Sequence, residues 1–281
     1  MATVDVITPI IDDPYLFGQI AAANSLSDIF AMGGKALYAL NVCSFPKEMD
    51  LRDADLIIEG ALAKLKEIEV PIAGGHTISE PSLLFGLSVT GLIADQKYFA
   101  NDMAKENQTL ILTKPFGIGV CYAANNANLL SEAEYQQWID TMTRLNYQAS
   151  VIAKKYVTTM SDVTGFGLLG HSLEIAKASQ VSFTINFEMI KFLPNVVEYA
   201  KQGYLTGASY TNYEALKTDI NSSRDQVIDL LLCDPQTSGG LLLVVAKDKQ
   251  EALLKELQEN NINAFVIGET TKLKDKYLQI K

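Results

Sequence analysis

Three aspartates stand where a folded chain could bring carboxylates together. Asp5 lies in a short β-branched run, Asp28 lies on the polar side of a long helical segment, and Asp162 precedes a glycine-rich turn. Carboxylate oxygens are hard ligands, and Mg2+ usually takes one or two of them and completes its octahedron with water and phosphate oxygens. The three residues therefore suggest a magnesium and nucleotide site, although each aspartate taken singly is more often a solvated or helix-capping residue.

A second candidate is the segment Gly74-Gly75-His76-Thr77, which follows an apolar run predicted to be a buried strand. Glycines leave the backbone N–H groups accessible, so Gly75, His76 and Thr77 could lie close to a phosphate or a ribose. A simple β-turn explains the same residues. The chain contains no G-x-x-x-x-G-K-[ST] sequence, which excludes a P-loop NTPase.

Residues 165–170 read G-F-G-L-L-G and match the dinucleotide-binding pattern G-x-G-x-x-G, with Glu188 near the position expected for a ribose-binding acid. The preceding run 158–162 is polar, however, and ends in the carboxylate of Asp162. That charge would repel a pyrophosphate unless a cation lay between them. We therefore favour glycines that allow a tight turn and close helix packing.

Residues 234–240 read D-P-Q-T-S-G-G and precede a strongly apolar run. A tight structural turn and a functional loop explain this segment equally well. His76 and His171 are the only histidines, and their separation gives no metal-ligand spacing.

Alternating strands and helices must position these residues. A carboxylate followed by Pro14 marks a helix start, and Gly33-Gly34 marks its end. In the first part of the chain the pattern predicts helices at 12–32 and 51–67, and strands at 4–7, 36–42, 70–73 and 84–94.

The remainder of the chain continues the alternation, with one loop-rich stretch from the predicted strand 181–187 to about residue 223. This pattern predicts an α/β layered fold in both halves. The polar, acidic segment 95–107 is the expected boundary. We therefore expect an N-terminal domain at 1–106 and a C-terminal α/β domain at 107–281. Further elements are predicted as a strand at 109–113, helices within 123–155, a turn at 161–167 followed by a helix to residue 179, strands at 241–246 and 264–268, and a helix at 247–259.

Composition excludes several classes of function. The 23 basic and 33 acidic residues give a net charge of −10, so a protein that follows nucleic-acid phosphates is not expected. No apolar run reaches the roughly 20 residues of a membrane span, and the N-terminus does not resemble a signal peptide. The cysteines lie far apart and lack neighbouring basic groups, which predicts inert buried thiols in a cytoplasmic protein. They are Cys43, Cys121 and Cys233.

Six segments, in order along nearly the whole chain, resemble selenophosphate synthetase (selenide, water dikinase). Any one of them is a weak signal, but six in the right order are highly specific. The match also explains the G-x-G-x-x-G sequence as a turn behind an aspartate. The segments are residues 8–14, 27–35, 74–78, 112–117, 161–171 and 234–241.

The resemblance implies a two-domain fold of the aminoimidazole ribonucleotide synthetase-like superfamily. It implies an enzyme that converts ATP, selenide and water into selenophosphate, AMP and phosphate. Family members are homodimers whose N-terminal domains pair strands into a β-barrel, with ATP held by Mg2+ at that junction. This implies ATP and selenide as the small-molecule partners, with neither nucleic acid nor a membrane.

By position within the matching segments, Asp28 corresponds to a residue that binds both metal and ATP. Asp162 corresponds to a metal ligand, and Asp5 corresponds to an aspartate of the ATP site. The resemblance assigns nucleotide contacts, made from the neighbouring subunit, to Gly75, His76 and Thr77.

The sequence departs from the family pattern at its start. The family carries a reactive cysteine or selenocysteine, a lysine just after it and a further metal-binding aspartate before the strand that holds Asp5. Here the sequence begins at that strand, and no cysteine stands in the nucleophile's place. We therefore assign no catalytic residue and expect this chain to be impaired. Either the sequence is trimmed, or its reading frame begins at an internal Met after an upstream UGA selenocysteine codon.

Two alternatives stay open. Other enzymes of the superfamily, such as thiamine monophosphate kinase, aminoimidazole ribonucleotide synthetase or the hydrogenase maturation dehydratase, share the aspartate-rich ATP site. A non-catalytic nucleotide-binding protein could also keep the scaffold. Product analysis separates the enzymes, since they differ in the acceptor and in the formation of AMP or ADP.

Overall fold

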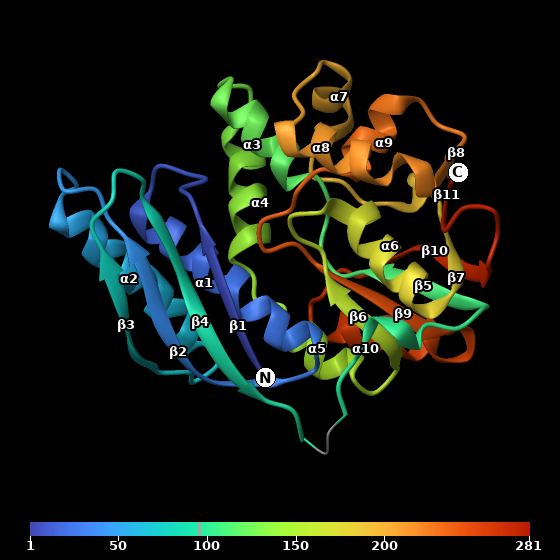
Figure 1. The fold of residues 1–281 in the computed structure, drawn as a ribbon, viewed down its shortest axis with the longest axis horizontal. Coiled ribbons are helices and arrows are strands. Elements are labelled where there is room, and N and C mark those ends of the chain that lie inside the picture. The colour runs from blue at the N-terminus through green and yellow to red at the C-terminus, as the bar shows by residue number, and fades with distance from the viewer. Residues whose placement is uncertain (95–96) are drawn as a thin grey trace. The chain divides into compact units, whose positions relative to one another are not determined.

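A computed structural model describes residues 1–94 and 97–281 (Figure 1). The chain divides into two compact units: residues 1–98 with 142–148, and residues 99–141 with 149–281. The division between Tyr98 and Phe99 falls within the expected linker 95–107, whose first two residues lie outside the described part. The sequence did not predict that residues 142–148 belong to the first unit.

The first unit contains a four-stranded sheet in the order β1-β4-β2-β3, with β1 at Ala2–Ile7, β2 at Lys35–Ser44, β3 at Ile72–Ile78 and β4 at Leu84–Leu92. Strand β4 is antiparallel to β1 and β2, whereas β2 and β3 are parallel. Helices α1 (Pro14–Ala31) and α2 (Leu51–Lys66) lie together on one face (Figure 1). Alternation in β4 turns Phe85, Leu87 and Val89, all fully buried, toward these helices.

A local capping signal explains where α1 begins, and tertiary contacts explain why residues 142–148 join this unit. The side chain of Asp13 accepts a hydrogen bond from Leu16 N at 2.9 Å, and Pro14 occupies the first turn. Asn146 Nδ2 donates a hydrogen bond to Ser27 Oγ at 2.9 Å. The rings of Tyr147 and Phe30 lie 5.5 Å apart. These contacts fix the short segment to α1.

The other face of this sheet is open and carries exposed apolar side chains. Residues paired across neighbouring strands share a face. The register places on this open side the even-numbered residues of β1 and β4, those of β2 from Tyr38 onward and those of β3 from Gly74 onward. Large apolar side chains are exposed there on every strand, and they are Val4, Val6, Tyr38, Leu40, Ile78 and Leu92.

The second unit contains a seven-stranded mixed sheet in the order β6-β9-β5-β10-β7-β11-β8. Its pairs are antiparallel except those of β11, which runs parallel to β7 and β8. The strands are β5 (Gln108–Leu112), β6 (Val157–Asp162), β7 (Val181–Ile185), β8 (Ile220–Ser222), β9 (Leu241–Ala246), β10 (Phe265–Lys272) and β11 (Leu278–Ile280).

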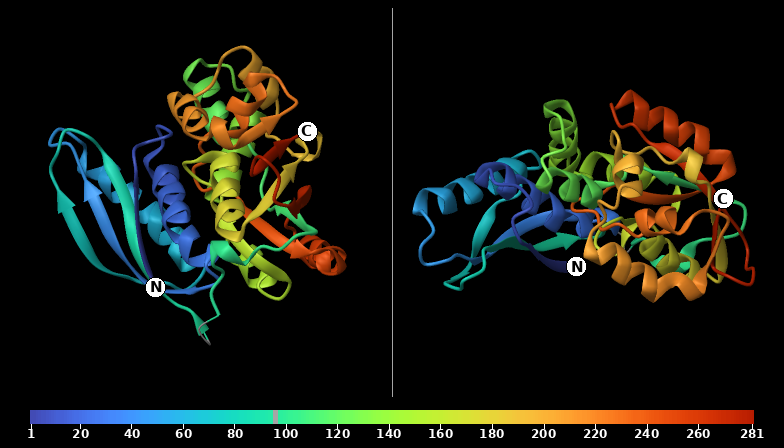
Figure 2. Two further views of the ribbon diagram at one scale, coloured as in Figure 1. Left: turned by 45° about the vertical axis from the view of Figure 1, so that its right-hand side comes forward. Right: turned by 90° about the horizontal axis from the view of Figure 1, so that it is seen from above.

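Helices lie on both faces of this sheet (Figure 2). Helix α6 packs on β7 and β11. The remaining helices of the chain are α3 (Ile118–Asn126), α4 (Glu132–Thr143), α5 (Tyr147–Ala153), α6 (Gly167–Ser179), α7 (Val196–Lys201), α8 (Gly207–Leu216), α9 (Gln226–Leu232) and α10 (Gln250–Glu259). The end of α4 and the start of α5 belong to the segment 142–148 of the first unit. The predicted mixed α/β architecture is confirmed, but the stretch expected to be loop-rich contains α7, α8 and β8. Among the described residues, no helix is long and apolar enough to span a membrane.

Candidate functional site

The carboxylate of Asp28 lies in the last turns of α1, against strand β1. Thr3 Oγ1 donates a hydrogen bond to Asp28 Oδ2, and both side chains are partly buried. Asp5 is two residues beyond Thr3 on the same strand, so its side chain leaves β1 on the same side. The structure thus brings Asp5 and Asp28 to one side of the sheet, where α1 packs.

Ser25, one turn before Asp28, joins α1 to the sheet. It is 1% exposed, and its Oγ lies 3.0 Å from Asp5 O and 2.9 Å from Ala21 O, both within donating distance. The same oxygen accepts a hydrogen bond from Leu87 N at 3.1 Å. One hydroxyl therefore connects the helix to β1 and β4 beside the aspartates. Sequence reasoning missed Ser25, because a serine within a helix gives no sign of what it contacts.

Replacing Ser25 with alanine should lower the free energy of unfolding by about 1–3 kcal/mol, because it leaves the buried Leu87 N–H and Asp5 carbonyl without this partner. Urea unfolding followed by circular dichroism measures the change. The control is Ser88→Ala, which removes a single partly buried hydrogen bond from Ser88 Oγ to Thr3 O. Equal unfolding midpoints for wild type and Ser25→Ala would show that this serine does not fix α1.

The donor set suits magnesium better than zinc. Among residues 1–94 and 97–281, no group of three or more His, Cys, Asp or Glu side chains could hold a metal ion. Structural and catalytic zinc sites need three or four protein ligands, whereas Mg2+ is usually held by one or two carboxylates together with water and phosphates. Thr3 occupies one oxygen of Asp28. Asp5 and Asp28 on one side of the sheet match in number the one or two carboxylates that a Mg2+ site usually uses.

Gly75, His76 and Thr77 lie in β3, and the predicted loop at this segment is wrong. The strand continues from Ile72 to Ile78 and is largely exposed, so the expected burial of this strand is also wrong. A Gly-Gly pair is typical of a turn, but here both glycines lie within the edge strand β3, with positive φ values of 149° and 155°. A Cβ on Gly75 would lie 2.4 Å from Asn41 O, so glycine is needed for the close approach of β2.

Within one chain, this glycine segment does not meet the aspartates of β1 and α1. Strands β1 and β3 are the two edges of the sheet, with β4 and β2 between them, and three strand spacings amount to about 14 Å. The register places His76 on the open face beside Val42. Thr77 contacts the Cys43 thiol on the opposite side. His76 and Thr77 therefore point to different faces of the sheet.

Gly75→Ala should reduce stability by about 1–3 kcal/mol more than Gly74→Ala. Both glycines have positive φ, but a Cβ on Gly74 would meet only Leu40 Cδ2, at an ordinary 3.8 Å. The two variants therefore share the backbone penalty and differ in the clash with Asn41. Their urea midpoints give the comparison, and equal midpoints would show that β2 and β3 relax without cost.

Asp162 is the last residue of β6 and is 6% exposed. It does not cap the following helix, because α6 begins after Phe166 with no side-chain cap. Val163 N donates to Gly240 O at 2.9 Å, and Gln236 N donates to Thr164 O at 3.0 Å. The end of β6 is therefore fixed to the segment 234–240.

Two of the three glycines at 165–170, Gly167 and Gly170, serve the turn and packing as predicted, whereas a Cβ on Gly165 would meet nothing within 4 Å. Gly167 has φ of +69°, and a Cβ there would lie 2.5 Å from the backbone carbon of Cys233. A Cβ on Gly170 would lie 2.5 Å from Phe166 Cβ. The turn and the close approach of α6 to its neighbours both require glycine.

The segment 234–240 holds the start of α3. Gln236 Oε1 accepts hydrogen bonds from Gly117 N and Ile118 N at 3.0 and 3.1 Å. Asp234 Oδ2 accepts from Gly119 N and Val120 N at 2.9 and 3.1 Å. Two side chains from a distant loop thus satisfy four N–H groups at a helix start that would otherwise lack partners. The structural explanation of this segment is therefore supported.

The cysteines are buried thiols, as predicted. Burial is the main cause that raises the pKa of Cys121 to about 12, and nearby Asp234 and Glu134 add to it. Burial, with Asp229 and Asp234, also raises the pKa of Cys233 to about 12. These two thiols stay protonated at neutral pH and are poor nucleophiles.

Comparisons with known proteins agree with this architecture. Residues 1–93 match the family model "AIR synthase related protein, N-terminal domain", and residues 105–281 match the corresponding C-terminal domain. A selenide, water dikinase from Clostridioides difficile is 39% identical over 99% of this chain and 81% of its own length. One from Campylobacter jejuni is 44% identical over 95% of this chain and 78% of its own length.

The chain belongs to the selenide, water dikinase family. This confirms the resemblance found in the sequence. Among solved structures, thiamine-monophosphate kinase from Stenotrophomonas maltophilia K279a has a TM-score of 0.79 at 17% identity, covering 100% of this chain and 84% of that one. The hydrogenase maturation protein HypE from E. coli has a TM-score of 0.75 at 15% identity, covering 99% and 82%. At such identity these likenesses show the fold of the family.

Proposed function

We propose that this chain catalyses the ATP-dependent synthesis of selenophosphate from selenide and water, with release of AMP and phosphate. The observation that carries the proposal is the identity of 39–44% to selenide, water dikinases over at least 95% of the chain. The placement of Asp5 and Asp28 on one side of the first sheet supports it, because an ATP site needs groups that can hold a metal–triphosphate complex.

In this proposal Asp5 and Asp28 belong to the ATP site, and Asp28 and Asp162 are ligands of Mg2+. When bound, the ion would neutralise charge on the triphosphate. Thr3 orients the Asp28 carboxylate by its hydrogen bond, and Ser25 fixes the helix that carries it. Groups held in place before the substrate arrives need little rearrangement during the reaction. Support for ATP comes from the related fold of a HypE structure described as a complex with ATP, whose TM-score is 0.72 at 15% identity.

The proposal includes a homodimer formed through the open face of the first sheet. Exposed apolar side chains on every strand, among them Val4, Val6 and Leu40, form the kind of surface that marks protein–protein contacts. The edge position of β3 supports a site shared between subunits, in which Gly75, His76 and Thr77 contact nucleotide bound by the partner. The location we propose is the cytoplasm, since buried free thiols suit a reducing compartment.

The test measures products formed from ATP by the purified chain with Mg2+, with and without selenide. Chromatography quantifies AMP and ADP, and 31P NMR detects selenophosphate. We expect slow but detectable AMP formation that depends on selenide, because no cysteine of this chain is assigned as the nucleophile and its activity is expected to be impaired. The control reaction replaces selenide with thiamine monophosphate. ADP formed only with that acceptor would assign the chain to a different kinase reaction, and ATP binding without any turnover would make it a nucleotide-binding protein; either result overturns the proposal.

A further inference from the structure

A row of polar side chains crosses the buried sheet of the second unit. The register aligns Thr109, Glu269, Thr184, Gln279 and Asn221 on five neighbouring strands. Directly paired residues share a face, so these side chains stand side by side. Thr109 is 3% exposed and Thr184 is 6% exposed. Gln279 is also buried, whereas the Glu269 side chain is 47% exposed and Asn221 is exposed. Buried sheet faces are usually apolar, so the buried members of the row require an explanation.

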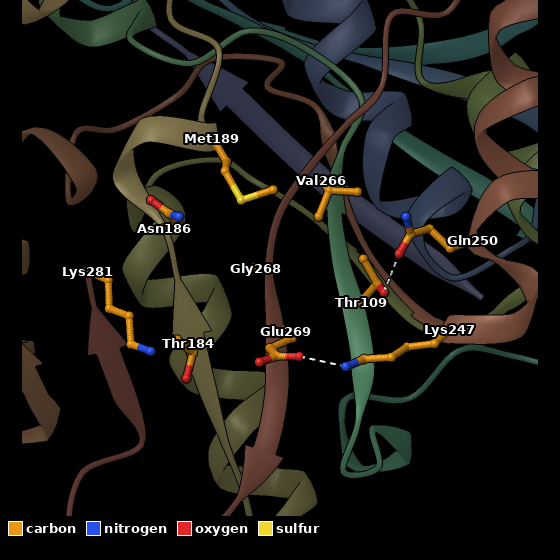
Figure 3. A pocket seen from close by; sticks show the side chains of 10 residues that line it. All are labelled: Thr109, Thr184, Asn186, Met189, Lys247, Gln250, Val266, Gly268, Glu269 and Lys281. Atoms are coloured by element: carbon orange, nitrogen blue, oxygen red, sulfur yellow. Dashed lines mark hydrogen bonds and ion pairs between the residues drawn. The ribbon is translucent and has the colours of Figure 1, made fainter.

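A pocket of about 420 Å3 lies over part of this row and is lined by residues of the second unit (Figure 3). Thr109, Glu269 and Thr184 contribute from β5, β10 and β7, and Gly268 contributes no side chain to the floor. Residues just before and at the start of α10, after β7 and after β11 complete the wall. The volume lies within the range of small-molecule sites.

Thr184 lines the pocket with a hydroxyl that lacks a partner. Its Oγ1 is buried and makes no hydrogen bond to any residue that the structure describes. Figure 3 shows Thr184 between the side chains of Lys281 and Glu269. A buried hydroxyl without a partner is unfavourable, so a ligand that accepts its hydrogen bond would be favoured here.

Several further donors line the same pocket. The amide oxygen of Gln250 accepts from Thr109 Oγ1 at 2.7 Å, and that of Asn186 accepts from Glu188 N at 3.2 Å. Each side chain therefore keeps its NH2 group for another acceptor. The Lys281 ammonium also lines the pocket and is a donor only. The pocket thus offers more donors than acceptors.

Charged side chains also line the pocket. Lys247 Nζ pairs with Glu269 Oε2 at 2.7 Å. That hydrogen bond is the main cause that lowers the pKa of the Glu269 carboxyl, and the charges of Lys247, Lys281 and Lys274 lower it further. Two lysine side chains, Lys247 and Lys281, line the pocket beside one side-chain carboxylate, that of Glu269.

We propose that this pocket binds a small organic anion, either a carboxylate or a phosphate ester. Its acidic group accepts hydrogen bonds from Lys281 and Thr184, and its carbon skeleton lies against Met189 and Val266. The site involves none of the residues proposed for ATP, so it is separate from the proposed function. Binding here needs neither ATP nor selenide.

Isothermal titration calorimetry of the whole chain tests the site with two probes, ribose 5-phosphate for the phosphate esters and citrate for the carboxylates. We expect saturable binding of at least one probe, weakened at least fivefold by Lys281→Met. Lys255→Met removes the same charge from a side chain 77% exposed on α10 and should leave the affinity unchanged. The Asp28→Ala variant should also bind the probe as wild type does, which distinguishes this pocket from the proposed ATP site.

Thr184→Val tests the hydroxyl while keeping the shape of the side chain. Without ligand, the thermal midpoint should stay the same or rise, because no partner is lost. The affinity for the probe should fall at least threefold. A lower midpoint without ligand would show that the hydroxyl already has a partner and would overturn its role. Failure of both probes to bind, or equal weakening by Lys255→Met, would overturn the site.

Discussion

Replacing Asp28 with alanine is expected to abolish the joint stabilisation of the protein by ATP and Mg2+. A ligand that binds only the folded state raises stability by about 2.7 kcal/mol at a hundredfold excess over its Kd. Asp28 is the carboxylate proposed to bind both metal and nucleotide, and Thr3 holds it in place. Without that carboxylate the Mg2+–ATP complex loses a ligand that the proposal requires for binding. The measurement is the thermal midpoint with ATP alone, Mg2+ alone and both together.

Two further variants separate binding from folding. Asp28→Asn keeps the size of the side chain and an oxygen for the Thr3 hydrogen bond but removes the charge, so it should fold normally and still lose the joint shift. Asp55→Ala removes an exposed carboxylate from α2 and should respond as wild type does. If Asp28→Ala shows the full joint shift, the assignment of Asp28 to the ATP site is wrong.

Asp234→Ala is expected to lower the free energy of unfolding by about 4 kcal/mol or more. Asp234 is fully buried and accepts hydrogen bonds from Gly119 N, Val120 N, Ser209 Oγ and Gln236 Nε2. Each buried donor left without a partner costs about 1–3 kcal/mol, and two of them belong to the first turn of α3. Urea unfolding gives the value, and a loss below 1 kcal/mol would show that water replaces the carboxylate.

Asp234→Asn should be milder and should change the pH dependence of stability. Burial raises the pKa of Asp234 from its ordinary 3.8 to about 7, although hydrogen bonds from Val120, Ser209, Gly119 and Gln236 act to lower it. Between these values the folded state holds a proton that the unfolded chain has released. This group's contribution to stability is therefore full below about pH 4 and is lost as the pH rises to about 7.

The asparagine variant has no such titration. Its stability relative to wild type should therefore improve as the pH rises from 5 to 8, and urea unfolding at each pH measures the difference. A difference that stays constant across this range would mean that Asp234 is already ionised at pH 5 in the folded protein.

Local sequence signals predicted the elements whose ends they determine. Asp13 and Pro14 predicted the start of α1, and the apolar run 241–246 predicted β9 at its observed bounds. The Gly74-Gly75 pair misled because a turn and a strained edge strand both need glycine, and only tertiary contact with Asn41 distinguishes them. Helices α7 and α8 were missed because short helices depend on packing more than on pattern.

The candidate site, like the fold, could be predicted only in part from the sequence. The polar side of α1 made Asp28 a candidate and the short first strand made Asp5 one, and their roles stay predictions. Their neighbours Thr3 and Ser25 became evident only when the register of β1 and β4 was known. Hydroxyl contacts between distant segments leave no periodic trace in a sequence, so such supporting residues require coordinates.

The capping of α3 by Asp234 bears on how the chain matures on the ribosome. The helix start and its carboxylate partner are 115 positions apart. At a translation rate of roughly 10 residues per second, the first turn of α3 waits about ten seconds for the side chain that completes it. During that interval the nascent second unit exposes apolar surface and backbone N–H groups that lack their hydrogen-bond acceptor. Protection by a chaperone would therefore matter most at this stage.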